Sequence, residues 1–259
     1  MKTIKHLLLV MASMFLLASC GKDPMPKDIR FSVLGDSYST FEGYVDPESN
    51  DVWYCPPPYN NIDVTSVEDM WWHKVAATMG WTLEKNNSFS GSLISNFWGY
   101  NSGPYYGPHS FIRRMDDLGD PDVIFVFGGT NDVWNGAFSG EFVYYGWTEG
   151  QLEQYRPALA YLFDHLVGRY PEAKIYFLVD MDFSTDDNQQ FVLSAQIIAR
   201  RYGICCIDLY DIQKDWAHPN AQGMSDIAAQ VVAVLRQSYY CLNRYSTFKS
   251  SSEGVGTSQ

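Results

Sequence analysis

Basic residues are scarce in this sequence, which has 18 Lys and Arg against 30 Asp and Glu among 259 residues and a formal net charge of −12. The basic residues do not gather into a run. Proteins that bind nucleic acid or anionic lipid headgroups need clustered Lys and Arg to neutralise phosphates. We therefore expect no nucleic-acid partner and no direct binding of the folded domain to an anionic membrane.

The sequence also lacks the spacings of a metal site, because it has no Cys-x-x-Cys pair and no two histidines at ligand spacing. Four acidic residues lie close together but match no calcium-loop pattern, and the start of a helix explains them better. They are Asp180, Asp182, Asp186 and Asp187. We expect neither a metal nor another cofactor.

Cysteine is sparse too, with four residues after position 20, at Cys55, Cys205, Cys206 and Cys241. Adjacent residues of a strand point to opposite faces, so Cys205 and Cys206 allow at most one natural bridge. Its partner would be Cys55 or Cys241. Buried thiols that act as small apolar groups are the alternative.

A long hydrophobic run occurs only at the N-terminus, where Lys2 and Lys5 precede the apolar stretch Leu7–Leu17. This stretch is too short to span a bilayer and is typical of a secretory signal. Leu17–Cys20 resembles a bacterial lipobox, in which Cys20 becomes the lipidated first residue. An ordinary signal peptide with a chance cysteine is the alternative. We expect an extracytoplasmic protein anchored to a bacterial membrane by lipid alone.

The chain would then consist of a signal peptide at 1–19, a tether at 20–29, one folded domain at 30–245 and a disordered tail at 246–259. The remaining 240 residues are enough for a single domain with a sizeable core. Loss of the two signal-peptide lysines would change the formal net charge from −12 to −14.

Short apolar runs alternate with segments of helical period, which predicts a parallel sheet between two layers of helices. The five expected strands are Arg30–Leu34, Thr82–Asn86, Asp122–Phe127, Lys174–Val179 and Ile204–Leu209. The expected helices are Ser66–Met79, one from Thr148 with a kink expected at Pro157, Ser184–Arg201 and Asn220–Tyr239. The fold class is therefore an α/β three-layer sandwich.

Ligands of open parallel sheets bind outside the carboxyl ends of the strands, and four polar segments follow the predicted strands there. They are Gly35-Asp36-Ser37, Ser90-Gly91, Gly128–Asp132 and Asp215–Asn220. Together these segments supply a hydroxyl, backbone donors, a side-chain amide, an imidazole and a carboxylate. Each segment alone could serve only to form a turn or to cap a helix. Together, however, the four segments supply every group that a hydrolytic site requires.

These four segments resemble, in order and position, the signature blocks of the SGNH/GDSL hydrolase superfamily. The resemblance implies a flavodoxin-like α/β/α fold. It implies Ser37 as nucleophile, His218 as base and Asp215 as the acid that orients His218. It also implies an oxyanion hole from the N–H groups of Ser37 and Gly91 and the side-chain amide of Asn131. Trp216 departs from the family pattern, in which small residues are common at that place.

Other titratable residues compete less well for these roles. His73 and His165 lie in predicted helices, and His109 has no acid at a useful spacing, although its aromatic loop could meet substrate. We expect Asp36 and Asp132 to bond backbone groups of their own tight loops.

The substrate class follows from two long loops, 38–65 and 97–109, which are rich in Tyr and Trp. Sugar rings stack on such side chains, so an acyl ester on a carbohydrate, most simply an acetyl ester, is the expected substrate. Candidate binding residues are Tyr38, Trp98, Trp134 and Trp216. Alternatives are a lipase or lysophospholipase, which would need an aliphatic groove, and an inactive glycan-binding lipoprotein, which would not need the triad.

Overall fold

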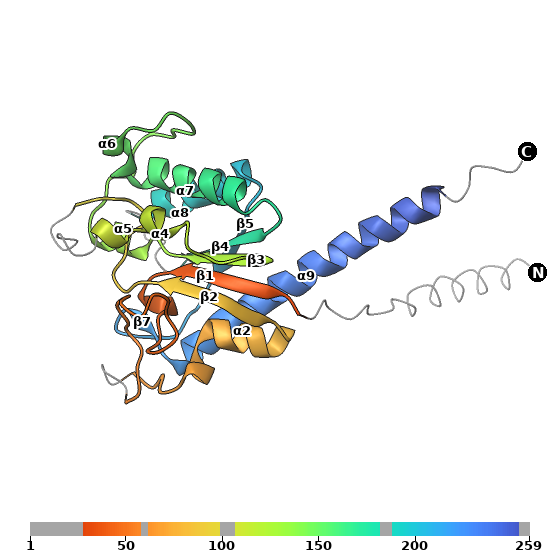
Figure 1. Ribbon diagram of the computed structural model, residues 1–259, viewed down its shortest axis with the longest axis horizontal. Helices are drawn as coiled ribbons and strands as arrows, with labels where there is room; N and C mark the ends of the chain where they lie inside the picture. The colour runs from red at the N-terminus through yellow and green to blue at the C-terminus, as the bar shows by residue number, and fades with distance from the viewer. Residues whose placement is uncertain (1–27, 58–61, 99–106, 182–187, 254–259) are drawn as a thin grey trace, which may run out of the picture.

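The computed structural model describes residues 28–57, 62–98, 107–181 and 188–253, with the backbone alone for 239–253. Its centre is a five-stranded parallel sheet in the order β2-β1-β3-β4-β5 (Figure 1). The strands are β1 (Arg30–Gly35), β2 (Thr82–Ser88), β3 (Val123–Phe127), β4 (Lys174–Asp180) and β5 (Cys205–Leu209). All five predicted strands are confirmed.

Helices cover both faces of this sheet, which confirms the three-layer architecture (Figure 1). One face carries α2 (Trp71–Met79) and α9 (Ala221–Glu253), and the other carries α4 (Phe111–Arg114), α7 (Tyr155–Arg169) and α8 (Gln189–Arg201). Strand β3 is buried at every position, as expected for a parallel strand between two helical layers. The two cores therefore lie on opposite sides of the same strands.

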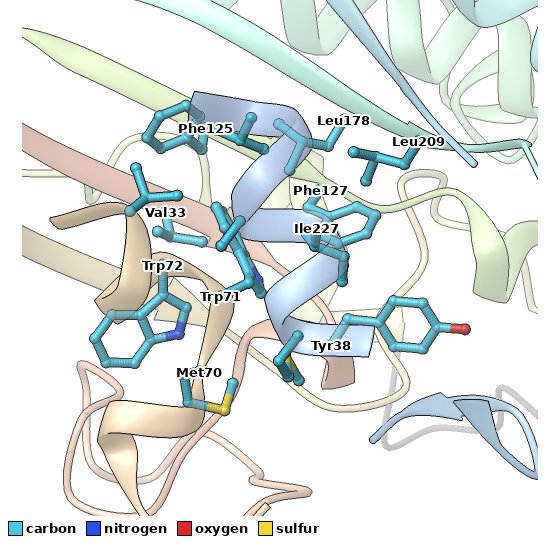
Figure 2. Close-up of a cluster of buried hydrophobic side chains, with 14 of the residues drawn as sticks. Val33, Tyr38, Met70, Trp71, Trp72, Phe125, Phe127, Leu178, Leu209 and Ile227 are labelled. Carbon is cyan, nitrogen blue, oxygen red and sulfur yellow. The ribbon is translucent and has the colours of Figure 1, made fainter. Parts of the chain in front are cut away.

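The core beneath α2 and α9 combines aliphatic side chains with several aromatic rings (Figure 2). Trp71 packs edge-on against Phe125 and Phe127 at ring-centroid distances of 5.7 and 5.9 Å. Tyr38 meets Phe127 in the same way at 5.6 Å. Since Tyr38 follows Ser37 in the chain, this core also supports the segment after β1.

Two expected helices are divided in the structure. The segment predicted as Ser66–Met79 is a 3-10 turn, η2 (Val67–Asp69), followed by α2, because Met70 is extended with ψ 139°. Both tryptophans at the start of α2 bond to Ser39 through their indole N–H groups, at 3.2 and 3.0 Å. These tertiary contacts set the start of α2, and sequence propensity cannot predict them.

The helix expected from Thr148 is likewise two helices, α6 (Glu149–Leu152) and α7. The predicted capping box is present, since the Gln151 N–H donates to Thr148 Oγ1 at 3.3 Å and the Thr148 N–H donates to Gln151 Oε1 at 2.9 Å. Pro157 lies in the first turn of α7 and causes no kink, because its missing N–H would have had no partner within the helix.

Helix α9 begins after Asn220, whose side-chain oxygen accepts from the Gly223 N–H at 3.0 Å, and it continues to Glu253. It therefore passes Ser246, where we predicted a disordered tail. Extending a nucleated helix adds one hydrogen bond per residue, which favours continuation over an early stop. Within the described residues, no helix has both the length and the apolar character needed to cross a membrane.

The cysteines of the described core do not form the expected bridge, since Cys55, Cys205 and Cys206 are free thiols. Cys205 is exposed, whereas Cys206 packs partly against the core under α8. The side chain of Cys241 lies outside the described part of the chain, so a bridge that involves it is untested.

Candidate active site

The segment after β1 places Ser37 at the carboxyl edge of the sheet. Ser37 opens the 3-10 turn η1 (Ser37–Ser39), and Asp36 caps this turn by accepting from the Tyr38 N–H at 3.0 Å, as predicted. A Cβ atom at Gly35 would lie 2.7 Å from Ser39 and from Ser88, so only glycine fits there. The Gly-Asp-Ser sequence thus makes a tight turn that presents the serine hydroxyl.

His218 meets this hydroxyl from the other end of the chain. It lies on a two-stranded hairpin formed by β6 (Lys214–Asp215) and β7 (His218–Pro219), and its Nε2 is 2.9 Å from Ser37 Oγ. Both residues line a cavity of about 570 Å³. The structure therefore brings the predicted nucleophile and base into hydrogen-bond contact.

Three side chains fix the hairpin that carries His218. The hydroxyl of Tyr38 donates to the Ala217 carbonyl, and that of Tyr54 donates to the Pro219 carbonyl at 2.8 Å. Lys214 pairs with Asp180 at the end of β4 at 2.7 Å, where both side chains are largely buried. Such a short hairpin depends on external anchors, because it has few hydrogen bonds of its own.

Trp53 covers one face of the imidazole, a contact that the sequence analysis did not anticipate. The two rings are stacked with centroids 3.7 Å apart and planes 9° apart. The Trp53 N–H of the backbone donates to Thr40 Oγ1 at 2.8 Å, which ties the 51–55 segment to the turn after Ser37. Its indole N–H is buried without a hydrogen-bond partner among the described residues.

Burial lowers the pKa of His218 from 6.5 to about 4. The ring is 8% exposed, so the charged imidazolium loses most of its hydration. At neutral pH the imidazole is therefore uncharged and can accept a proton from Ser37.

Asp215 lies beside His218 in the hairpin but does not bond to its ring. The two residues are directly opposed across β6 and β7. Asp215 is exposed, and the hydrogen bond described for its carboxylate comes from the Asn220 side chain at 3.4 Å. The structure thus places the predicted acid next to the base without the expected contact.

The predicted oxyanion-hole residues converge on the same cavity. Gly91 has φ +76°, a conformation that glycine adopts without strain, and it lines the cavity with Ser37 and Asn131. The N–H groups of Ser37 and Gly91 donate to no other described residue. The Asn131 side chain donates to the Ser92 carbonyl at 3.0 Å and to Asp36 Oδ2 at 3.4 Å. Its amide thus links the Ser37 turn to the Gly91 loop.

Asp132 has a different partner from the one predicted. It accepts from the N–H groups of Ile94 and Ser95 at 2.7 and 3.1 Å and from the Ser95 hydroxyl at 2.6 Å. It therefore fixes the loop after Gly91, not its own loop. Burial raises the pKa of Asp132 to about 6 and that of Asp36 to about 7, although hydrogen bonds to both carboxylates act in the opposite direction.

A buried arginine that the sequence analysis did not single out lies behind these loops. Arg114 donates to the carbonyls of His109 and Gly35 at 2.7 and 3.1 Å, to the Ser92 hydroxyl at 3.0 Å and to the Asn87 carbonyl. The ends of β1 and β2 and the Gly91 loop are therefore joined by one guanidinium. Burial lowers its pKa to about 9, and the charge of Asp36 opposes this change.

The four aromatic residues predicted to bind substrate differ in whether they line the Ser37 cavity. Trp134 lines the cavity and is 40% exposed. Tyr38 is buried, so its prediction as a substrate contact is wrong, because its hydroxyl is used by the hairpin. Trp216, with φ +60°, is fully exposed between the two hairpin strands and is not among the residues that line the cavity. Trp98 lines a second cavity.

The other residues considered for a functional role lie away from Ser37 or outside the described residues. His109 stacks on Phe89 with ring centroids 4.1 Å apart and does not line the cavity. His165 bonds Asp116 at 2.6 Å on the surface. Cys20 and most of the acidic group after β4 lie outside the described residues. Among the residues that are described, no three His, Cys, Asp or Glu side chains are grouped to hold a metal ion.

Comparisons with known proteins match most of the chain. The family model for GDSL-like lipase/acylhydrolase matches residues 29–235. A structure described as a GDSL-like lipase from Bacteroides ovatus is similar to this chain with 46% identity and a TM-score of 0.76, covering 82% of this chain and all of the other. One from Bacteroides uniformis has 44% identity and a TM-score of 0.74, with 79% and 93% covered.

A more distant likeness concerns an acetyl xylan esterase from Butyrivibrio proteoclasticus. Its identity to this chain is 18% and its TM-score 0.52, and the match covers 83% of this chain and 64% of the other. This likeness shows the fold alone. A comparison with curated proteins finds none that matches.

Proposed function

Because the chain belongs to the GDSL-like lipase/acylhydrolase family, whose members hydrolyse esters, we propose that it is a serine esterase with Ser37 as nucleophile and His218 as base. The observation that carries this proposal is the 2.9 Å contact between His218 Nε2 and Ser37 Oγ in a cavity that also contains oxyanion donors. A hydroxyl beside an uncharged imidazole is the arrangement that nucleophilic ester cleavage requires.

The reaction proceeds in two halves. Ser37 Oγ attacks the ester carbonyl while His218 Nε2 takes the hydroxyl proton, and the oxyanion receives hydrogen bonds from the N–H groups of Ser37 and Gly91. Asn131 donates a third when it gives up its longer bond, of 3.4 Å, to Asp36. Collapse of this intermediate expels the alcohol, which takes the proton from His218, and leaves an acyl group on Ser37. A water molecule then gives a proton to His218 and attacks the acyl carbonyl, and collapse of this second intermediate releases the acid while His218 returns the proton to Ser37 Oγ.

Asp215 acts as the orienting acid after a side-chain rotation. Opposed residues of antiparallel strands have Cβ atoms about 4.5–5.5 Å apart, so the Asp215 carboxylate can reach the second ring nitrogen of its neighbour. The contact forms when His218 is protonated during the reaction, since the positive ring then attracts the carboxylate more strongly than Asn220 does. In this mechanism Asp215 stabilises the imidazolium.

The substrate class we propose is a short acyl ester, most simply acetyl, on a carbohydrate. The cavity is lined by polar side chains, including Glu42, Asp51 and Asn131, together with the rings of Trp53 and Trp134. Val52 is the single aliphatic residue in that lining. Carboxylates and amides can bond to sugar hydroxyls, whereas a long acyl chain would gain little burial here.

Lipid esters and an inactive glycan-binding role are less well supported. The described cavity offers no aliphatic groove for a long chain. An inactive binding protein would have no need for the close contact between Ser37 and His218. The α/β fold shared with the acetyl xylan esterase is compatible with sugar-ester chemistry without demonstrating it.

The location we propose is extracytoplasmic, with a lipid anchor on Cys20. It rests on the sequence Leu17–Cys20 and the apolar stretch before it. One acyl chain gives marginal membrane binding, so stable anchoring would require several chains on this residue.

The test compares p-nitrophenyl esters of increasing acyl length with acetylated xylo-oligosaccharides. We expect acetyl esters to be the best substrates and Ser37→Ala and His218→Ala each to remove nearly all turnover while the proteins remain folded by circular dichroism. Substantial turnover by Ser37→Ala would disprove the nucleophile. A preference for acyl chains of about eight carbons or more would favour a lipase, because each buried methylene adds roughly 0.8 kcal/mol.

A further inference from the structure

A second cavity of about 590 Å³ lies near α4 and α6, apart from the Ser37 cavity. It is lined by two aromatic rings and by polar side chains of both signs of charge. Trp98 and Tyr161 supply the rings, Glu149 and Glu153 the carboxylates, and Arg113 with Asn96 the donors. None of these residues takes part in the mechanism above.

The aromatic part of this cavity combines one ring packed against the core, that of Tyr161, with one exposed ring, that of Trp98. Trp98 is 62% exposed, which is a large apolar area for a residue that does not stabilise the core. Tyr161 is held from behind by Trp147, whose ring lies edge-on at a centroid distance of 5.3 Å. One wall is therefore a fixed ring and the other an exposed indole, as expected for a site that holds the apolar face of a sugar.

The polar part retains free acceptors. Among the described residues, the carboxylates of Glu149 and Glu153 take part in no hydrogen bond or ion pair. Both lie at α6, whose first turn is fixed by the capping box of Thr148 and Gln151. These carboxylates can therefore accept hydrogen bonds from sugar hydroxyls without giving up a partner in the protein.

The floor of the cavity is preorganised by Asn96. Its backbone N–H donates to the Leu152 carbonyl at 2.9 Å, and its side-chain oxygen accepts from the Ser110 hydroxyl at 2.6 Å and from Arg113 at 3.2 Å. A cavity already held in shape binds a ligand with less ordering cost than one that must form.

This cavity is close enough to the Ser37 cavity for one oligosaccharide to occupy both. Gly91 lines the Ser37 cavity and Asn96 lines the second, and five residues of chain separate their Cα atoms by at most about 18 Å. The intervening Ser95 is fixed by Asp132, next to Asn131. The segment between the cavities is therefore a rigid link.

We propose that the second cavity is a distal subsite that binds a neutral sugar unit of the polymer whose ester is cleaved at Ser37. The proposal rests on the esterase function given above. The two free carboxylates outnumber the single positive charge of Arg113, whose guanidinium already bonds to Asn96, so the site favours neutral hexose or pentose units over uronates. Binding here would hold the ester-bearing unit beside Ser37.

Binding can be measured without hydrolysis by calorimetry of the full chain with unacetylated xylotetraose, cellotetraose, mannotetraose and tetragalacturonate. We expect at least one neutral tetrasaccharide to bind and tetragalacturonate to bind more weakly. Trp98→Ala should weaken that binding about two- to tenfold, which is the usual effect of losing one stacked ring. It should raise KM for the acetylated oligosaccharide by a similar factor and leave turnover of p-nitrophenyl acetate unchanged.

Two further variants separate a subsite from a general effect on the protein. Tyr145→Ala removes another exposed ring, 82% accessible and outside the described cavities, and it should bind like the wild type. Glu153→Gln keeps hydrogen bonding but removes a charge, so it should improve tetragalacturonate binding relative to neutral sugars.

Several outcomes would overturn the proposal. They are binding of none of the four sugars, equal affinity in wild type and Trp98→Ala, or tighter binding of the uronate. Failure of the esterase itself is distinguishable, because it would abolish p-nitrophenyl acetate turnover while leaving Trp98-dependent sugar binding measurable.

Discussion

The stack of Trp53 on His218 predicts a defined change in the pH dependence of catalysis. The difference between a pKa of about 4 and the ordinary 6.5 corresponds to roughly 3 kcal/mol against the charged imidazole. Trp53 covers one of the two ring faces, so about half of this penalty, roughly 1.5 kcal/mol, is attributable to it.

An opposing effect of the same indole is smaller. An aromatic face attracts a cation by about 0.5–1 kcal/mol at exposed sites and by about 2 kcal/mol when the pair is desolvated. Trp53 is half-buried, so the attraction that favours the charged imidazole is about 1 kcal/mol here. Removing Trp53 therefore lowers the desolvation penalty on the charged imidazole by more than it reduces the attraction between that ring and the indole. The net effect of roughly 0.5 kcal/mol corresponds to a rise of about 0.4 units in the pKa of His218 in Trp53→Ala.

The measurement is the acid limb of kcat/KM for p-nitrophenyl acetate between pH 3.5 and 7, because kcat/KM reports the ionisation of the free enzyme. His218 must be uncharged to accept the Ser37 proton, so activity falls as pH drops through its pKa, and the limb should move upward in Trp53→Ala. Trp53→Phe is the matched control, since it keeps an aromatic cover and removes the unpartnered indole N–H. A limb that stays in place or moves downward in Trp53→Ala would show that burial by Trp53 does not set this pKa.

Four further predictions concern single residues. Asn131→Ala should lower turnover by about a hundredfold to a thousandfold with little change in KM, and an unchanged rate would remove it from the oxyanion hole. Asp215→Asn should cost about a hundredfold or more if the carboxylate turns to His218, whereas a loss below tenfold would mean that it stays with Asn220. The pKa of Asp36 is about 7 in the folded protein and 3.8 when the side chain is exposed, so ionisation of Asp36 destabilises the fold as pH rises. The free energy of unfolding in urea should therefore increase for Asp36→Asn relative to wild type by roughly 2–3 kcal/mol between pH 5 and pH 8. A difference between the two proteins that stays constant with pH would contradict this. Cys20→Ser should release the protein from the membrane fraction, and a wild-type product found wholly in the soluble fraction would argue against lipidation.

The strands and the four polar segments were predictable because both depend on local sequence. A run such as Val123–Phe127 is apolar throughout, and a parallel strand buried on both faces requires that pattern. The turn residues that follow the strands are also local signals, since Gly91 has a φ of +76°, which glycine adopts without strain.

Contacts between distant segments could not be predicted in this way. The position of Met70 depends on Trp71 and Trp72 reaching Ser39, and nothing in the sequence near Met70 encodes that. Trp53 and Arg114 were missed for the same reason, because their partners lie on other loops. Tyr38 was misjudged since exposure cannot be read from an aromatic residue in a loop, and its burial comes from the hairpin that packs on it.

Tyr38 couples two ends of the chain, because it follows the nucleophile and its hydroxyl bonds to Ala217, 179 positions away. The contact between Ser37 and His218 spans 181 positions, so it is among the most non-local in the molecule. Contacts of such separation form late in folding, since the entropy of closing the loop must first be offset by the intervening core. During synthesis the first strand would carry a complete Gly-Asp-Ser turn long before any base exists to activate it. Esterase activity would therefore appear only after the hairpin that carries His218 has been made and has docked. Its recovery on refolding would report that docking more directly than a spectroscopic measure of helix or strand content.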